Sequence, residues 1–367
     1  MNLRNTGIVF RNPQPHIRSF HAYFPSVADL GGGELICSMM AGQAFESADC
    51  RLYLARSRDN GLTWTLEGRM LPEAASGVWS ESGRLTYSRD GSVWLLVARS
   101  DRHRANEGLG NPDTLGFVET TFGLAQSLDR GRSWSTLRHL ASPLGKVPLE
   151  MCSPVLELSN GRWLIPSSIW KHWDGTAPAG VKAVALISDD HGASWPAYTV
   201  VMDRWAQKII CWEQKIIELA PGKLLTVAWC YDAQAARDLH NAFAITKDFG
   251  SSFTAPVDTD LNGQTPSLLA LDPDTALCVY RRTDVVGLWA AKVSVAGGRW
   301  KTMEQTALWG APSLTTGPTS SNAIENLNVL RFGAPCLNRL SDGDVLVTFW
   351  CVEDGVSNIR WIRLAGV

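Results

Sequence analysis

SRDNGLTW, at Ser57–Trp64, is an eight-residue stretch that the chain repeats, and this repetition decides the fold. The further copies are SLDRGRSW, SDDHGASW and the weaker TKDFGSSF, at 127–134, 188–195 and 246–253. The shared pattern is Ser or Thr, any residue, Asp, any residue, Gly, two residues, and then Trp or Phe. We expect the Asp to accept hydrogen bonds from backbone N–H groups two and three residues on, the Gly to take a positive φ, and the ring to be buried beneath the turn. Such a turn is a staple, repeated because a larger unit is repeated.

A second repeated element surrounds the staples. It consists of two apolar strands joined by a tight turn, and six copies begin near Pro25, Gly83, Ser153, Gln214, Pro266 and Ala334. Each copy is followed by another alternating strand, and helical periodicity is almost absent. Short strands at regular spacing with period-two alternation predict an all-β repeat architecture. Six units of roughly 60 residues predict one domain over residues 1–367, a six-bladed β-propeller with four-stranded antiparallel blades.

The two ends of the chain complement each other. The last unit lacks a fourth strand, and the N-terminal stretch GIVFRN at 7–12 is a spare strand ahead of the first unit. Pairing the two closes the ring and covers both strand edges. An open solenoid is the rival architecture, but it requires capping ends, and neither end of the chain resembles one.

Composition excludes several kinds of partner. The formal net charge is -2 in 367 residues, which argues against a nucleic-acid partner. The N-terminus has no apolar run of signal-peptide length, and no stretch approaches the roughly 20 apolar residues of a membrane span, so we expect a soluble, cytoplasmic protein with no membrane partner. The eight cysteines form no CxxC pair, and neither an HExxH motif nor clustered histidine ligands occur, so we expect no metal and no cofactor.

In a propeller the innermost strands start around a central axis, so the side chains at their beginnings are expected to converge on one funnel. Here those positions are Tyr23, Glu81, Glu150, Glu213, Gln264 and Arg331, with His21, Trp79 and Trp212 beside them. Three carboxylates and an arginine would then face each other. For any single Glu a structural bond to a backbone amide or an arginine is the more common role, so the functional interpretation depends on the set of three.

Paired carboxylates are the groups that glycosidic bond cleavage requires. One carboxylic acid protonates the leaving oxygen, and one carboxylate activates water or attacks the anomeric carbon. We expect the neighbouring aromatic rings to stack on sugar faces and the arginine to bind a carboxylate substituent through two parallel hydrogen bonds. The long polar segments 99–113 and 169–180 are either rims over the funnel or solvated loops.

The staples and the sixfold strand repeat together resemble the sialidase superfamily, whose six-bladed propellers carry these turns as Asp boxes, also called BNR repeats. The resemblance covers nearly the whole chain, and it implies the fold more than the activity, because the boxes lie away from the family's catalytic face. WEQKIIELAPGKLLTVAW, at 212–229, matches the family's fourth blade and implies a catalytic glutamate at Glu213. The resemblance also implies a general acid at Asp49 or Glu46, in the loop before the first box strand.

Several family positions are altered in this chain. The family's Arg-Ile-Pro reads Tyr23-Phe24-Pro25 here, so the first carboxylate-binding arginine is missing unless Arg11 or Arg18 replaces it. At and near the places of the other two arginines stand Trp229, Arg281 and Arg282. The tyrosine nucleophile falls at about Ala334, which has no hydroxyl.

The sequence therefore predicts a glycoside hydrolase of the sialidase-like superfamily that acts on a small saccharide, and it argues against a tyrosine-nucleophile sialidase. The catalytic candidates are Glu213, Asp49, Glu150, Glu81 and Tyr23, and the substrate-binding candidates are Arg331, His21, Arg18, Arg281, Trp79 and Trp212. Two alternatives stay open. One is a uronate-type oligosaccharide lyase in which Tyr23 or His21 abstracts a proton and Arg331 neutralises the sugar carboxylate. The other is a non-catalytic carbohydrate-binding propeller.

Overall fold

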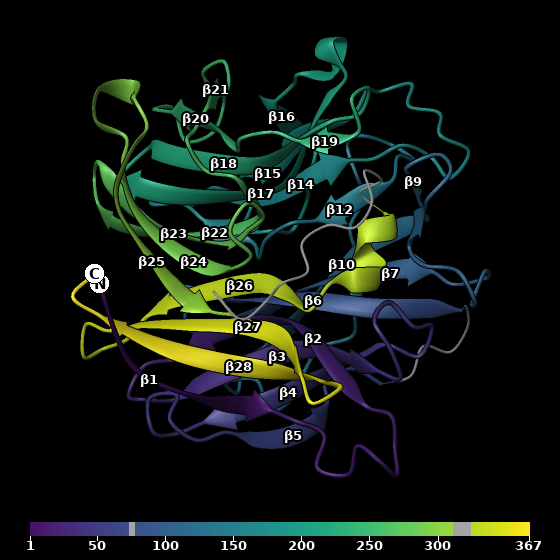
Figure 1. The fold of residues 1–367 in the computed structure, drawn as a ribbon, viewed down its shortest axis with the longest axis vertical. Helices are drawn as coiled ribbons and strands as arrows, with labels where there is room; N and C mark the ends of the chain where they lie inside the picture. Colours follow the sequence, from purple (N-terminus) through teal and green to yellow (C-terminus); the bar gives the residue numbers. More distant parts are fainter. Residues whose placement is uncertain (73–77, 311–323) are drawn as a thin grey trace. The chain divides into compact units, whose positions relative to one another are not determined.

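The computed structural model describes residues 1–72, 78–310 and 324–367. Six antiparallel sheets, each with a path of four strands, account for most of these residues, and the fold is a six-bladed β-propeller (Figure 1). The helical segments among them are three short 3-10 turns, η1 (Trp205–Gln207), η2 (Ala296–Gly298) and η3 (Glu325–Val329). The predicted fold class is confirmed. In the described part of the chain, no helix has the length and apolar character needed to cross a membrane.

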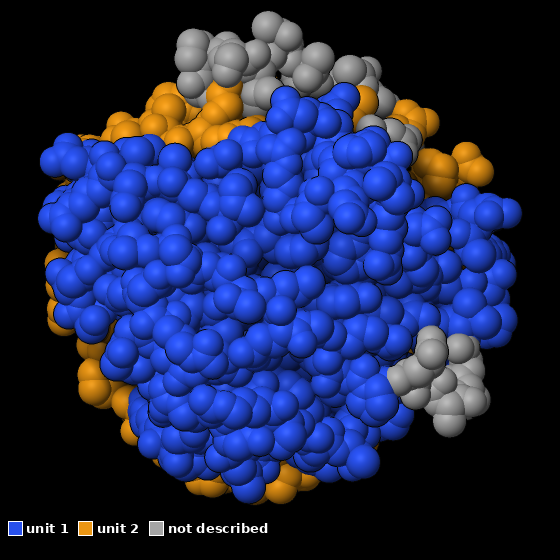
Figure 2. All heavy atoms as spheres, turned by 90° about the horizontal axis from the view of Figure 1, so that it is seen from below, with its two compact units in different colours: residues 1–109, 120–140, 331–367 blue, residues 110–119, 141–330 orange. Residues whose placement is uncertain are grey.

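The chain divides into two compact units, which Figure 2 colours separately. Unit 1 comprises Met1–Leu109, Thr120–Leu140 and Arg331–Val367, and unit 2 comprises Gly110–Glu119 and Ala141–Leu330. Each unit contains three blades, and each is described by itself below. The prediction of a single domain over residues 1–367 stays a prediction.

Unit 1 contains the first, second and sixth blades. The first consists of β2 (His21–Asp29), β3 (Leu35–Gly42), β4 (Arg51–Ser57) and β5 (Thr65–Arg69). The second consists of β6 (Trp79–Tyr87), β7 (Val93–Asp101), β10 (Thr120–Ser127) and β11 (Arg138–His139). The sixth consists of β26 (Phe332–Arg339), β27 (Val345–Glu353), β28 (Val356–Ala365) and β1 (Asn2–Phe10). Because β1 pairs with β28, the predicted closure of the last blade by the N-terminal strand is confirmed.

Unit 2 contains the third, fourth and fifth blades, and the hairpin of β8 (Gly110–Asn111) and β9 (Gly116–Phe117). The third blade consists of β12 (Leu149–Met151), β13 (Leu156–Glu157), β14 (Trp163–Ile169), β15 (Lys182–Ser188) and β16 (Ala197–Met202). The fourth consists of β17 (Ile209–Ala220), β18 (Lys223–Asp232), β19 (Arg237–Asp238), β20 (Ala242–Thr246) and β21 (Val257–Asp258). The fifth consists of β22 (Gly263–Asp272), β23 (Thr275–Arg282), β24 (Gly287–Ser294) and β25 (Lys301–Trp309).

Apolar side chains from adjacent blades form the core of each unit. In unit 2 one cluster joins blades three and four, including Leu164 and Leu224, and another joins blades four and five, including Val227 and Cys278. The middle strands are buried over nearly their whole length, as in β14 and β18. Strands covered on both faces are mostly apolar, which explains why these stretches read as nearly continuous apolar runs.

The staples close the turns largely as predicted. In the first one the Ser57 hydroxyl donates to Asp59 Oδ1 at 2.8 Å and accepts the Gly61 N–H at 2.9 Å. Asp59 Oδ1 accepts the N–H groups of Leu62 and Thr63 at 3.1 and 2.9 Å, three and four residues on. The predicted offset of three residues is confirmed, whereas the predicted offset of two was wrong, because the serine hydroxyl takes the N–H group of Gly61, two residues after Asp59. Gly61 has the predicted positive φ, +84°.

Removing the staple hydroxyl is expected to destabilise the protein. Ser57 is 1% exposed, so Ser57→Ala leaves the buried Gly61 N–H without its acceptor. We expect the free energy of unfolding to fall by about 2 kcal/mol, measured by urea denaturation. Ser57→Thr is the control and should stay near wild type, because a threonine, Thr246, makes the same contact with Asp248 in the fourth staple. Equal stability of the alanine and threonine variants would contradict this prediction.

Four inner strands share one distortion. The register of β2, β17, β22 and β26 shifts at equivalent points. The residues inside these bulges are Phe24, Glu213, Thr265 and Ala334, with φ of 50, 49, 48 and 47°. Positive φ is uncommon for residues other than glycine, and a bulge of this kind re-aims the side chain that it carries. Glu213 and Ala334 thus stand at equivalent places of two blades.

Candidate functional site

Unit 2 brings two of the predicted carboxylates together. Glu150 lies on β12 and Glu213 on β17, in neighbouring blades. The Glu213 backbone N–H donates to Glu150 Oε2 at 3.3 Å, and the Trp170 Nε1–H donates to the same oxygen at 3.4 Å. Glu213 Oε2 accepts the Thr265 N–H at 2.9 Å from β22, in the fifth blade. All three blades of unit 2 therefore contribute to this pair.

The two carboxyl groups influence each other's protonation. Desolvation by burial is the main cause that raises the pKa of Glu213, and the negative charge of Glu150 adds to it, so that this pKa lies at about 7. Burial also raises the pKa of Glu150, against the opposing effects of Lys215 and of its hydrogen-bond donors. Near neutral pH such a pair tends to hold one proton.

Two cations stand beside the pair. Lys215 follows Glu213 on β17, and its Nζ donates to the Cys152 carbonyl oxygen. Arg281, at the end of β23, is 7% exposed. The positive charges of Arg281 and Lys215 both act to lower the pKa of Glu213, and thereby limit the effect of burial. The site thus combines two carboxyl groups with two basic groups.

Arg281 is fixed by a chain of hydrogen bonds. Its Nε and Nη2 donate to Gln264 Oε1 at 3.0 and 2.6 Å. Gln264 Nε2 donates to Asp238 Oδ2 at 2.7 Å, and Trp229 Nε1 donates to Asp238 Oδ1 at 2.8 Å. The sequence pattern placed Gln264 among the funnel positions without a role, and it did not single out Asp238. No sequence signal marks Asp238, because its position depends on the two-residue strand β19 pairing with β18.

The aromatic residues beside Glu150 form part of the core. Trp212 stacks on Trp170 with ring centroids 4.7 Å apart and on Tyr231 at 5.4 Å. Trp212 was predicted to stack on a sugar, but it is 1% exposed, and a ring so buried offers no free face to a ligand. Its contacts instead support β17 and the Trp170 indole that donates to Glu150.

Unit 1 holds the third predicted carboxylate, Glu81. Glu81 and Arg99 are directly opposite on β6 and β7. Arg99 Nε donates to Glu81 Oε1 at 3.0 Å, and Arg99 Nη2 forms an ion pair with the same oxygen at 2.9 Å. The Glu81 side chain is 5% exposed. The structural ion pair considered for any single Glu is thus present at Glu81. The prediction that Glu81 shares a funnel with Glu150 and Glu213 concerns both units and stays a prediction.

The other inner-strand candidates of unit 1 differ in exposure. His21 Nδ1 accepts the Ser357 N–H at 3.0 Å, and burial lowers the pKa of His21. Tyr23 is 5% exposed, and burial raises the pKa of its hydroxyl far above the ordinary value. Trp79 is half-buried at the start of β6, and Arg331 is exposed just before β26. The basic nitrogen of His21 is already occupied and Tyr23 is hard to ionise, so neither favours proton abstraction.

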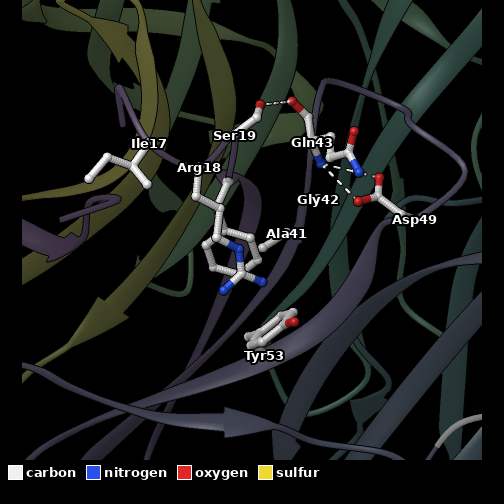
Figure 3. A pocket seen from close by; sticks show the side chains of 9 residues that line it. Ile17, Arg18, Ser19, Ala41, Gly42, Gln43, Asp49 and Tyr53 are labelled. Carbon is white, nitrogen blue, oxygen red and sulfur yellow. Dashed lines mark hydrogen bonds between the residues drawn. The ribbon is translucent and has the colours of Figure 1, made fainter. Parts of the chain in front are cut away.

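Arg18 and Asp49 line one pocket of unit 1, with a volume of about 340 Å³. The Arg18 guanidinium lies 5.2 Å from the centroid of the Phe20 ring. In Figure 3 its side chain extends toward Tyr53, while the Asp49 carboxylate faces the backbone of Gln43. Both Asp49 oxygens accept the Gln43 N–H at 3.2 Å, so this carboxylate holds the loop of the pocket.

Glu46, the alternative acid of the same loop, has a different environment. It is half-buried, and its Oε2 accepts the Leu109 N–H at 2.9 Å. Burial is the main cause that raises the pKa of Glu46 above its ordinary value. Burial therefore favours the protonated form of Glu46, one of the two acids that the resemblance implied.

No protein-family model and no curated protein matches the chain. Among solved structures, a protein of unknown function from Dyadobacter fermentans DSM 18053 matches with 20% identity and a TM-score of 0.73, over 99% of this chain and 98% of that one. The NanB sialidase from Streptococcus pneumoniae matches with 13% identity and a TM-score of 0.66, over 98% and 70%. A leech intramolecular trans-sialidase in complex with 2,7-anhydro-Neu5Ac matches with 14% identity and a TM-score of 0.66, over 99% and 70%. This chain therefore has the fold of these sialidases.

Proposed function

We propose that the protein is a glycoside hydrolase that acts on a small saccharide, with Glu213 as general acid and Glu150 as its carboxylate partner. The observation that carries this proposal is the Glu150–Glu213 pair, in which a backbone N–H of one residue binds the carboxylate of the other at 3.3 Å. A general acid works best when its pKa lies near the working pH, and the pKa of Glu213 is raised to about 7.

The roles follow from the two environments. Glu213 in its protonated form donates its proton to the glycosidic oxygen as the bond to the anomeric carbon breaks. Glu150, which receives hydrogen bonds from Trp170 and from the Glu213 N–H, acts as the carboxylate that either activates water or attacks the anomeric carbon. Lys215 and Arg281 limit the repulsion between the two carboxyl groups.

A tyrosine nucleophile has no place in this mechanism. Ala334 occupies the bulge of β26, the position equivalent to Glu213 on β17, and its methyl group has no nucleophilic atom. The carboxylate of Glu150 supplies that chemistry in the proposal, which differs in this respect from the mechanism that the resemblance implies.

The test is turnover of a panel of aryl glycosides, sialosides and unsaturated uronides. We expect wild type to release the aryl alcohol with uptake of water, and we expect Glu213→Gln to lose this activity. Formation of an unsaturated product that absorbs in the ultraviolet indicates the lyase instead. Full activity of Glu213→Gln overturns the assignment of the general acid.

Ala334 also favours a second candidate function, a non-catalytic carbohydrate-binding propeller. A chain that has lost its nucleophile is expected to retain the fold and bind a sugar without cleaving it. Isothermal titration with the same panel distinguishes the two candidates, because binding without turnover in wild type supports the second and contradicts the first.

A further inference from the structure

Gln264 connects a buried carboxylate to a buried arginine in unit 2. Gln264 and Arg281 are directly opposite on β22 and β23, and each is 7% exposed. The Gln264 amide oxygen accepts both Arg281 donors, and its nitrogen donates to Asp238. Turning the amide round would place its NH₂ group against the guanidinium donors and its oxygen against the carboxylate. Asp238 thus sets the orientation in which Gln264 can hold Arg281.

Asp238 is itself fixed on both oxygens. Oδ1 accepts the Trp229 Nε1–H, and Oδ2 accepts the Gln264 amide, at 2.8 and 2.7 Å. Four strands, β18, β19, β22 and β23, contribute to this chain. Its far end is Arg281, whose charge interacts with the carboxylates of both Asp238 and Glu213.

We propose that Gln264 and Asp238 are positioning residues, which hold the Arg281 guanidinium beside Glu213 and so determine how firmly Glu213 retains its proton. The catalytic purpose of this arrangement rests on the proposed function, because a general acid must be protonated before the reaction and release its proton during it. The remaining groups that act on Glu213 are Glu150 on β12, Lys215 on β17, the nearby Cys152 and the Thr265 N–H on β22.

The substitution Gln264→Met separates positioning from charge. Methionine is similar in size to glutamine and equally neutral, so the variant removes the hydrogen bonds to Arg281 and Asp238 without adding or removing a charge. A change in the protonation of Glu213 must then come through the position of Arg281. Without its acceptor Arg281 is expected to move away from Glu213, and the loss of a nearby positive charge raises the pKa of a carboxyl group.

The experiment is a pH titration of the substrate-free protein, followed by NMR of ¹³C-labelled glutamate side chains, with Glu213→Gln used to assign the Glu213 signal. We expect Gln264→Met to raise the pKa of Glu213 by about one pH unit, and Arg281→Met to raise it by at least as much. In the Arg281→Met background, Gln264→Met should add nothing, because both act through one guanidinium. The proposal is overturned if Gln264→Met leaves the pKa of Glu213 unchanged. It is also overturned if Gln264→Met shifts this pKa as much in the Arg281→Met background as in wild type.

Asp238→Asn provides a second test should Gln264→Met fail to fold. Loss of the negative charge alone lowers the pKa of Glu213, whereas release of Gln264 and Arg281 raises it. A rise therefore supports positioning, and a fall or no change contradicts it. The titration needs no substrate, so a failure of the proposed glycosidase activity stays distinguishable from a failure of this inference.

Discussion

Glu213→Gln lowers kcat on the best substrate of the panel by about 10²- to 10⁴-fold, the contribution usual for a general acid. The amide keeps an oxygen that can accept the Thr265 N–H, but it has no proton to give to the leaving oxygen. KM should change little, because the substitution conserves size. Glu304→Gln, an exposed glutamate on β25 in the same unit, is the matched control and should keep wild-type activity.

The pH dependence of kcat provides an independent check of the same group. The pKa of Glu213 is raised from its ordinary value of 4.5 to about 7, so the acid form dominates below neutral pH. As the pH rises through 7, Glu213 loses its proton and kcat falls, which gives the alkaline limb of the profile. This limb should be absent from the residual activity of Glu213→Gln. If Glu213→Gln retains an alkaline limb with the same midpoint, that limb reports the titration of another group.

The strand repeat and the staples made the fold predictable because both depend on local chemistry. A serine, an aspartate and a glycine at fixed spacing close the same turn wherever they occur, and period-two alternation depends only on the pleat of a strand. The pairing of β1 with β28 could be predicted because the last unit lacked a fourth strand and the N-terminal stretch was a spare one. The hydrogen bond from the Thr63 N–H to Asp59, four residues on, did not follow, since it depends on the Ser57 hydroxyl taking the N–H group of Gly61.

The candidate site was predictable only where residues occupy equivalent places on inner strands. Glu150 and Glu213 were predicted in this way. The sequence named Arg281 and Arg282 together near the place of one family arginine, and the structure separates them, since neighbouring residues of a strand point to opposite faces. Arg281 binds Gln264, whereas Arg282 binds Asp284 and lies over Trp289.

Burial and non-local pairing account for what the sequence did not reveal. Whether Trp212 faces a ligand or the core depends on Trp170, just after β14, and on Tyr231 of β18. Asp238 enters the site because β19 folds back on β18, a pairing of two residues that leaves no periodic pattern in the sequence.

A buried ion-pair network in unit 1 is expected to contribute strongly to the free energy of unfolding. The Arg56 side chain has no exposed surface, and its guanidinium donates to Glu34 at 2.8 Å and to Glu67 at 2.6 and 3.0 Å. It also donates to the Arg130 carbonyl oxygen at 3.0 Å, within the second staple, while the Arg130 side chain binds Glu34 at 2.7 Å. Arg56 therefore links the first blade of unit 1 to the second.

Arg56→Met should lower the free energy of unfolding by about 3 kcal/mol, because removing one partner of a buried ion pair leaves the others desolvated and uncompensated. The effect exceeds that of an exposed pair, for which about 0 to 1 kcal/mol is usual. Urea denaturation measures it, with Arg58→Met as the matched control, since Arg58 is exposed two residues away. If both variants unfold at the same urea concentration, the network contributes no more than an exposed arginine does. A loss confined to Arg56→Met instead assigns the stability of the blade contact to the ion pairs and hydrogen bonds of Arg56.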